Sequence, residues 1–142
     1  MIESNDLSLE EIHVGQEVQF KVGISKSMVE KFVELSGDCN PLHTNESYSK
    51  DAGFPRIVCH GMLLASLLSR LVGMYLPGKN ALYLSQSLKF VSPCFVDDEI
   101  IIKGKILKKS MSSRIITLET KIVKNNDINV VIGEAKVMVR EN

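Results

Sequence analysis

An acid and an imidazole, Asp38 and His43, stand five residues apart in the chain. An aspartate beside a histidine can move a proton to or from water near neutral pH. Pro41 lacks a backbone N–H and pushes Asn40 out of the helical region of φ/ψ space, and Gly37 is a natural helix stop. We therefore expect the pair to lie on an irregular loop that Asn40 and Pro41 fix.

Two longer blocks of sequence surround this pair. The first consists of Phe32, Leu35, Ser36-Gly37-Asp38, Asn40-Pro41-Leu42-His43 and Ser49. The second spans residues 57–66 and contains His60-Gly61. The first block resembles the hydratase-2 motif of MaoC-like proteins, a family of (R)-specific enoyl-CoA hydratases and related dehydratases, and the second resembles the entry to that family's central helix. The resemblance, over residues 12–140, implies a hot-dog fold, a homodimer, and reversible hydration of trans-2-enoyl-CoA to (R)-3-hydroxyacyl-CoA.

This reaction needs a base, an acid, and a donor for the thioester oxygen, which gains negative charge. Asp38 is expected to be the general base toward water, while His43 orients that water and protonates the α-carbon. Because coupled groups share their titration, the division of these two roles stays open. Gly61 begins an apolar helix, whose first backbone N–H would suit the oxygen. No metal, flavin or nicotinamide is needed, and the sequence has no GxGxxG or Walker pattern.

Further residues are expected beside the substrate. Asn40 belongs to the motif, and we expect it to fix the loop more than to take part in chemistry. Ser69 interrupts the apolar helix and could face the thioester or the water; the alternative is a hydroxyl bonded to the preceding turn. Family geometry suggests that Val72 and Val137, otherwise core residues, limit the acyl pocket. Gln86 is an amide on an apolar strand face, so it needs partners and is expected to brace the active-site loop.

Other functions stay open at this point. A dehydratase of acyl-carrier-protein thioesters would use the same residues, and a catalytically silent acyl-CoA-binding module would not need them. A hot-dog thioesterase could use a Cys–His pair, but adjacent side chains on an extended loop point apart, so Cys39 and Asp38 cannot readily serve one site. His60 could be a ligand or an acid, but beside Gly61 we expect a structural role. The three histidines are too scattered along the chain for a recognisable metal motif.

Two helices must position these residues. Residues 27–36 predict the first helix, and Ser27 opens a capping box at its start. Residues 61–76 predict a second helix that is apolar nearly all round. At this length, and with Arg70 inside it, the second helix is too short and too charged to cross a bilayer. We therefore expect a central helix wrapped by a sheet and ended by Pro77-Gly78.

The rest of the chain carries strand signals. Alternation and β-branched runs predict strands over residues 17–22, 82–91, 99–107, 114–123 and a final stretch near the C-terminus. In the strand at 82–91, the side chains of Leu82, Leu84, Leu88 and Phe90 would lie on one apolar face. In the final strand, Val131, Ala135, Val137 and Val139 would likewise lie on one face. Asn125-Asn126-Asp127 is a hairpin-turn signal. One strand, two helices and a run of antiparallel strands indicate the α+β class, in agreement with a hot-dog fold.

Composition bounds the class of protein. The chain has 142 residues, 44% of them hydrophobic, enough for a single domain over residues 1–142 with its own core. Lys+Arg and Asp+Glu both total 17, so the zero net charge gives no argument for nucleic acid or an acidic membrane. Three cysteines without CxxC spacing suit a reducing cytosol, and the polar N-terminus does not read as a signal peptide. Pairing of exposed sheet edges favours a homodimer.

Overall fold

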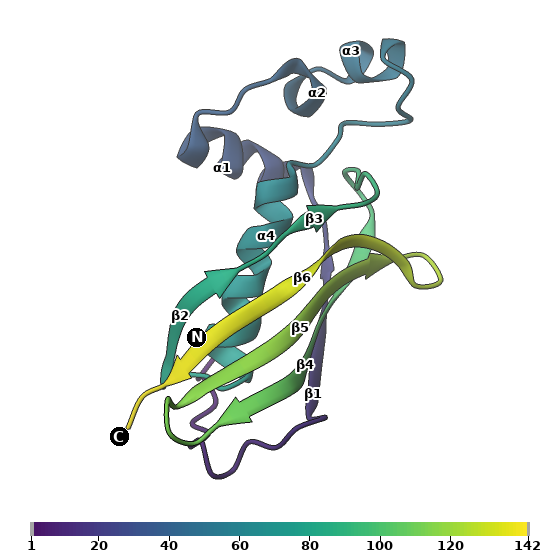
Figure 1. Cartoon of the computed structure of the whole chain (residues 1–142). Helices are drawn as coiled ribbons and strands as arrows, with labels where there is room; N and C mark the ends of the chain where they lie inside the picture. Colours follow the sequence, from purple (N-terminus) through teal and green to yellow (C-terminus); the bar gives the residue numbers. More distant parts are fainter. Residues whose placement is uncertain (1, 142) are drawn as a thin grey trace.

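The computed structural model describes residues 2–141 as an antiparallel sheet curled around a long helix (Figure 1). The strands are β1 (Glu17–Gly23), β2 (Ala81–Gln86), β3 (Lys89–Phe90), β4 (Glu99–Ser110), β5 (Ile115–Lys124) and β6 (Ile128–Val139). The helices are α1 (Lys26–Ser36), α2 (Pro41–Thr44), α3 (Glu46–Asp51) and α4 (Gly61–Arg70), followed by a π-helical turn, η1 (Leu71–Tyr75). The predicted α+β class and hot-dog fold are confirmed.

The sheet runs in the order β1-β4-β5-β6-β2, and β3 pairs with β6 beside β2. Every pairing is antiparallel. The hairpin between β5 and β6 turns at Asn125–Asp127, where all three residues have positive φ, as the Asn/Asp-rich signal predicts. This order leaves β1 and β2 as the two edges of the sheet.

The core lies between the sheet and the helix formed by α4 and η1. Leu64 and Leu68 of α4 belong to one buried cluster with Ile102 of β4. Val72 of η1 belongs to a second buried cluster with Val137 of β6. Burying a side chain of this size stabilises the fold by about 1.5–3 kcal/mol, so these contacts fix the helix against the sheet. α1, α2 and α3 gather at the end where α4 begins (Figure 1).

One face of α4 is uncovered in the single chain. Met62, Ser66 and Ser69 are exposed at positions i, i+4 and i+7, which share one helix face. The prediction of a helix buried all round is therefore wrong for this face, because the sheet covers only the opposite side. Within residues 2–141, no helix is both long and apolar enough to span a membrane.

Two local predictions also need correction. Ser25, not Ser27, caps α1, since its hydroxyl accepts a hydrogen bond from the Met28 N–H (3.1 Å). Residues 82–91 form two strands rather than one, since β2 ends at Gln86 and β3 begins only at Lys89. The pairing of β2 with β6 also shifts register just after Tyr83, inside β2. Leu88 of the apolar face predicted there is half-buried against the core, but the other three members, Leu82, Leu84 and Phe90, are exposed. They lie along a sheet edge that residues 2–141 leave uncovered.

Candidate active site

Asp38 lies in the turn between α1 and α2, directly after the helix stop at Gly37. Its backbone N–H donates to Ser36 Oγ (3.1 Å), and its Oδ1 accepts from the Asn40 N–H (3.2 Å). The second bond is an Asx turn, in which a side chain satisfies the backbone two residues on. It occupies one carboxylate oxygen and leaves Oδ2 available, with 51% of the side chain exposed.

His43 lies on the one-turn helix α2, so the predicted irregular loop is wrong for this residue. Pro41 is at the start of α2, where a missing N–H costs nothing. Asn40 caps the turn by accepting from the Leu42 N–H (3.0 Å), consistent with its expected loop-fixing role. Nδ1 of His43 donates to the Val58 carbonyl oxygen (2.6 Å), so Nε2 is the ring nitrogen that remains for chemistry.

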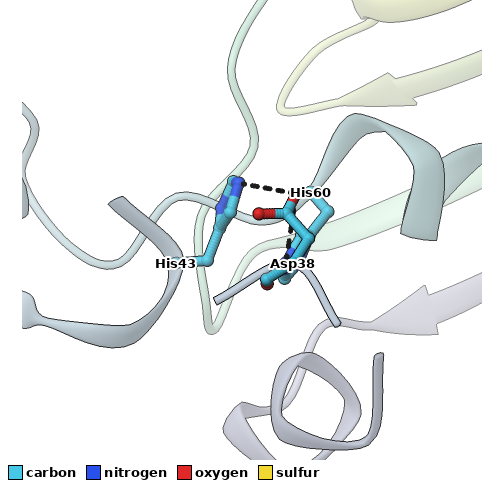
Figure 2. A group of neighbouring side chains, drawn as sticks. All are labelled: Asp38, His43 and His60. Carbon is cyan, nitrogen blue, oxygen red and sulfur yellow. Dashed lines mark hydrogen bonds and ion pairs between the residues drawn. The ribbon is translucent and has the colours of Figure 1, made fainter. Parts of the chain in front are cut away.

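Asp38, His43 and His60 gather into one cluster (Figure 2). Oδ2 of Asp38 lies 3.9 Å from His43 Nε2 and 4.0 Å from His60 Nε2. The two imidazole rings stack, with centroids 3.7 Å apart and planes at 25°. His60 Nε2 donates to the Asp38 backbone oxygen at 3.0 Å. A structural role was the main expectation for His60. Its contacts with Asp38 and His43, about twenty positions earlier in the chain, arise only in the folded protein.

The cluster raises the question of a metal, since its three ligand atoms lie within 4.8 Å of one another. The expectation that the histidines are too scattered is therefore wrong for His43 and His60. Zinc ligands converge on the ion at about 2.0–2.1 Å. Lone pairs in the nearly parallel planes of two stacked rings do not converge in this way, and His60 Nε2 already donates to Asp38. The arrangement suits proton transfer better than metal coordination.

A pocket of about 430 Å³ joins the cluster to the N-terminus of α4. Its mostly apolar lining includes His43, Gly61, Met62, Phe90, Cys94 and Val130. No side chain caps α4, and the first N–H groups of a helix lack partners within the helix itself. Gly61 therefore presents a backbone donor, at the positive end of a helix dipole, to whatever enters the pocket.

The remaining predicted substrate-binding residues lie apart from this cluster. Ser69 is exposed on the uncovered face of α4, whereas Val72 of η1 and Val137 of β6 are buried together in the core. The pocket lining, taken over residues 2–141, contains none of the three. Their role in substrate binding stays a prediction.

Gln86 braces the sheet rather than the active-site loop, which corrects the prediction made for it. Its Nε2 donates to Thr120 Oγ1 on β5 and to the Ser87 carbonyl, both at 2.9 Å, and its Oε1 accepts from the Tyr83 hydroxyl. The register shift in β2 turns this amide toward the neighbouring strands.

The cysteines do not favour a thiol nucleophile. Cys59 and Cys94 line the pocket, but burial raises the pKa of Cys59 to about 12 and that of Cys94 to about 11. Because the thiolate is the reactive form, both groups are inert near neutral pH. Cys39 is exposed and outside the pocket lining. A thioesterase of the Cys–His type therefore finds no support in this geometry.

Comparison with known proteins agrees with the fold. Residues 10–128 match the MaoC-like domain. The (R)-specific enoyl-CoA hydratase of Aeromonas caviae is 39% identical over 131 residues, or 92% of this chain and 98% of that protein. A solved (R)-hydratase structure from A. caviae superposes with a TM-score of 0.89 at 38% identity, covering 92% and 98% of the two chains. A mitochondrial 3-hydroxyacyl-[acyl-carrier-protein] dehydratase of Arabidopsis thaliana is 35% identical over 127 residues, covering 87% and 75%. The chain therefore belongs to the MaoC-like family.

Proposed function

We propose that the chain, acting as a single catalytic domain, hydrates trans-2-enoyl-CoA reversibly to (R)-3-hydroxyacyl-CoA. The observation that carries the proposal is the placement of Asp38 Oδ2 and His43 Nε2, 3.9 Å apart, beside a pocket that ends at the uncapped N-terminus of α4. The (R) stereochemistry follows from the similarity to (R)-specific hydratases.

The separation of Asp38 and His43 favours a water molecule between them. A distance of 3.9 Å is too long for a direct hydrogen bond, and it is a separation that one water can bridge. Asp38 takes a proton from this water as the water oxygen attacks the β-carbon. His43 starts with a proton on Nε2 and gives this second proton to the α-carbon. The proton that Asp38 took from the water then passes to Nε2 of His43, which restores both groups.

The thioester oxygen needs a donor while it carries negative charge. Gly61 supplies it through the backbone N–H at the start of α4, where the helix dipole also favours an anion. The acyl chain then extends from the pocket, and Asn40, Ser69, Val72 and Val137 are proposed to shape its surroundings. The apolar lining of the pocket suits an acyl chain.

The protein is further proposed to act as a cytoplasmic homodimer. The edge strand β2 exposes Leu82 and Leu84, and a second copy that pairs along this edge would bury them. Three free cysteines fit a reducing compartment.

Removing either proton-transfer group tests the mechanism. Asp38→Asn and His43→Ala should each lower kcat by about 10²–10⁴-fold while leaving the fold intact. Since both groups serve one step, the double variant should lose far less than the product of the single losses. Loss of the enoyl absorbance of crotonyl-CoA measures the rate, and circular dichroism checks the fold. A single variant that keeps more than about a tenth of wild-type kcat would remove that residue from the mechanism.

The second candidate, a dehydratase of acyl-carrier-protein thioesters, is favoured by the similarity to the plant enzyme. Crotonyl-CoA, octenoyl-CoA and a crotonyl-carrier protein assayed side by side would separate the two substrates by kcat/KM. Tight acyl-CoA binding without turnover of any of the three would instead indicate a binding module.

A further inference from the structure

The mechanism above assigns no role to His60, although this residue is buried inside the site. Its side chain is 2% exposed. Its ring packs between the edge of Phe32 (centroids 4.8 Å apart, planes at 62°) and the face of His43. Leucine or phenylalanine would fill such a space without burying two ring nitrogens. Packing alone therefore does not account for a histidine at this position.

The hydrogen bond of His60 determines which ring nitrogen carries its proton. Nε2 lies 3.0 Å from the backbone oxygen of Asp38, and a carbonyl oxygen can only accept. The proton is therefore on Nε2. Nδ1 is buried and has no hydrogen-bond partner within the described residues, which destabilises the fold relative to a hydrocarbon side chain. The N–H at Nε2 is the part of the residue that a hydrocarbon could not replace.

We propose that His60 is a positioning residue that holds Asp38 and His43 in their reacting geometry. Its Nε2–H anchors the backbone of Asp38, while the Asn40 N–H anchors Oδ1 of the same residue. With both points held, Oδ2 stays directed toward His43. The 4.0 Å from His60 Nε2 to Oδ2 exceeds a hydrogen bond, so His60 orients the carboxylate without occupying its reactive oxygen.

The same hydrogen bond couples the base to the proposed oxyanion donor. His60 is the N-cap residue of α4 and directly precedes Gly61. The hydrogen bond from His60 to Asp38 thus connects two parts of the site. It ties the turn that contains the base Asp38 to the first turn of α4, which contains the Gly61 donor. A misplacement of about 1 Å between such groups can lower the rate about 10²-fold, so this short connection matters more than the longer path through α2 and α3.

Three substitutions separate positioning from packing. Glutamine can place an N–H near the position of His60 Nε2, asparagine reaches only that of Nδ1, and phenylalanine keeps a ring without a donor. The kinetic test rests on the proposed function and follows crotonyl-CoA hydration. His60→Phe should lower kcat about 10–100-fold, the usual scale for losing a supporting hydrogen bond around a reactive group. KM should change less than about twofold, His60→Gln should recover most of kcat, and His60→Asn should not.

Thermal unfolding tests whether the role of His60 is merely structural. The unfolding temperature of His60→Phe should be at least that of the wild type. Wild-type kcat in His60→Phe would overturn the proposal. A kcat that follows the folded fraction in all three variants, or equal kcat for His60→Gln and His60→Asn, would overturn it as well.

A second measurement does not depend on hydratase activity. Long-range ¹⁵N NMR of the wild type should show His60 protonated on Nε2 and not on Nδ1. The backbone amide signals of Asp38 and His43 should move in His60→Phe and stay near the wild-type positions in His60→Gln. If these signals are unchanged in His60→Phe, or if Nδ1 carries the proton, the positioning role is wrong even for an active hydratase. If they behave as expected in a chain that hydrates no enoyl thioester, only the proposed function fails.

Discussion

At position 61 the fold leaves little room for a side chain. A Cβ added to Gly61 would lie 2.7 Å from Cε1 of Phe90, closer than two carbon atoms approach without repulsion. Gly61 is not among the glycines with positive φ, so backbone conformation does not require a glycine there. Phe90 is 51% exposed, and its ring can swing aside. We propose that the glycine keeps the helix N-terminus accessible to the thioester.

We expect Gly61→Val to fold and to lose about 10²-fold or more in kcat, the usual scale for losing an oxyanion donor. Steady-state kinetics measures the loss, and thermal unfolding checks the fold. Adding Phe90→Ala removes the contact between the Phe90 ring and the new side chain at position 61. The new side chain would still block the thioester from the helix N-terminus. If Gly61→Val/Phe90→Ala regained wild-type activity, the loss would belong to the Phe90 contact and not to the helix N-terminus.

At the scale of elements, the two edges of the sheet differ in chemistry. The edge strand β2 exposes Leu82 and Leu84, whereas the outward positions of β1 carry Glu17, Gln19 and Lys21. Charged and polar side chains on an edge oppose pairing with another strand, and apolar ones permit it. The proposed dimer should therefore form through β2 and not through β1.

Leu84→Lys should shift the protein toward monomer, because pairing would bury the lysine charge against a second copy. Gln19→Lys adds the same charge at the opposite edge and should leave the oligomeric state unchanged. Size-exclusion chromatography with light scattering, over a range of concentrations, reports both results. A dimer that Leu84→Lys leaves intact, or a wild type that is monomeric throughout, would place the interface elsewhere or remove it.

Local rules predicted most elements of the fold. Gly37 ends α1 in the left-handed conformation, and the apolar run after Gly61 forms α4. Two features depended on more than local sequence. Pro41 was expected to keep this segment out of a helix but opens α2, and only the Asn40 cap decides that a helical turn follows. The register shift at Tyr83 depends on the pairing with β6, which no local pattern encodes.

For the candidate site, the sequence pointed to Asp38 and His43 because motif and loop chemistry agree there. The stack of His60 on His43 was missed, since it arises from tertiary packing. One signal was available: His60 directly precedes the glycine that opens α4, so its side chain had to lie near the proposed donor. Gln86 was misplaced because strand alternation cannot anticipate an irregular edge.

Across the whole molecule, burial is uneven. The sheet and α4 hold two large clusters of buried apolar side chains. Among residues 37–55, which carry Asp38 and His43, Ser49 is the one fully buried residue. Its hydroxyl donates to the Arg56 carbonyl (2.7 Å), one of few anchors for this segment. The proposed proton-transfer pair thus lies on a sparsely buried segment of the fold.

Such a segment should open without unfolding of the sheet, since the free energy of local opening falls with the apolar area that is buried. We expect backbone amides of α2 and α3 to exchange with deuterium much faster than those of β5. Hydration activity should be lost at lower urea than the β-sheet signal in circular dichroism. Coincident urea midpoints, or equal protection of α3 and β5, would contradict this expectation. The two parts of the molecule would then limit different properties. The sheet sets the resistance to global denaturation, whereas the lifetime of the closed 37–55 segment sets how long each molecule stays able to react.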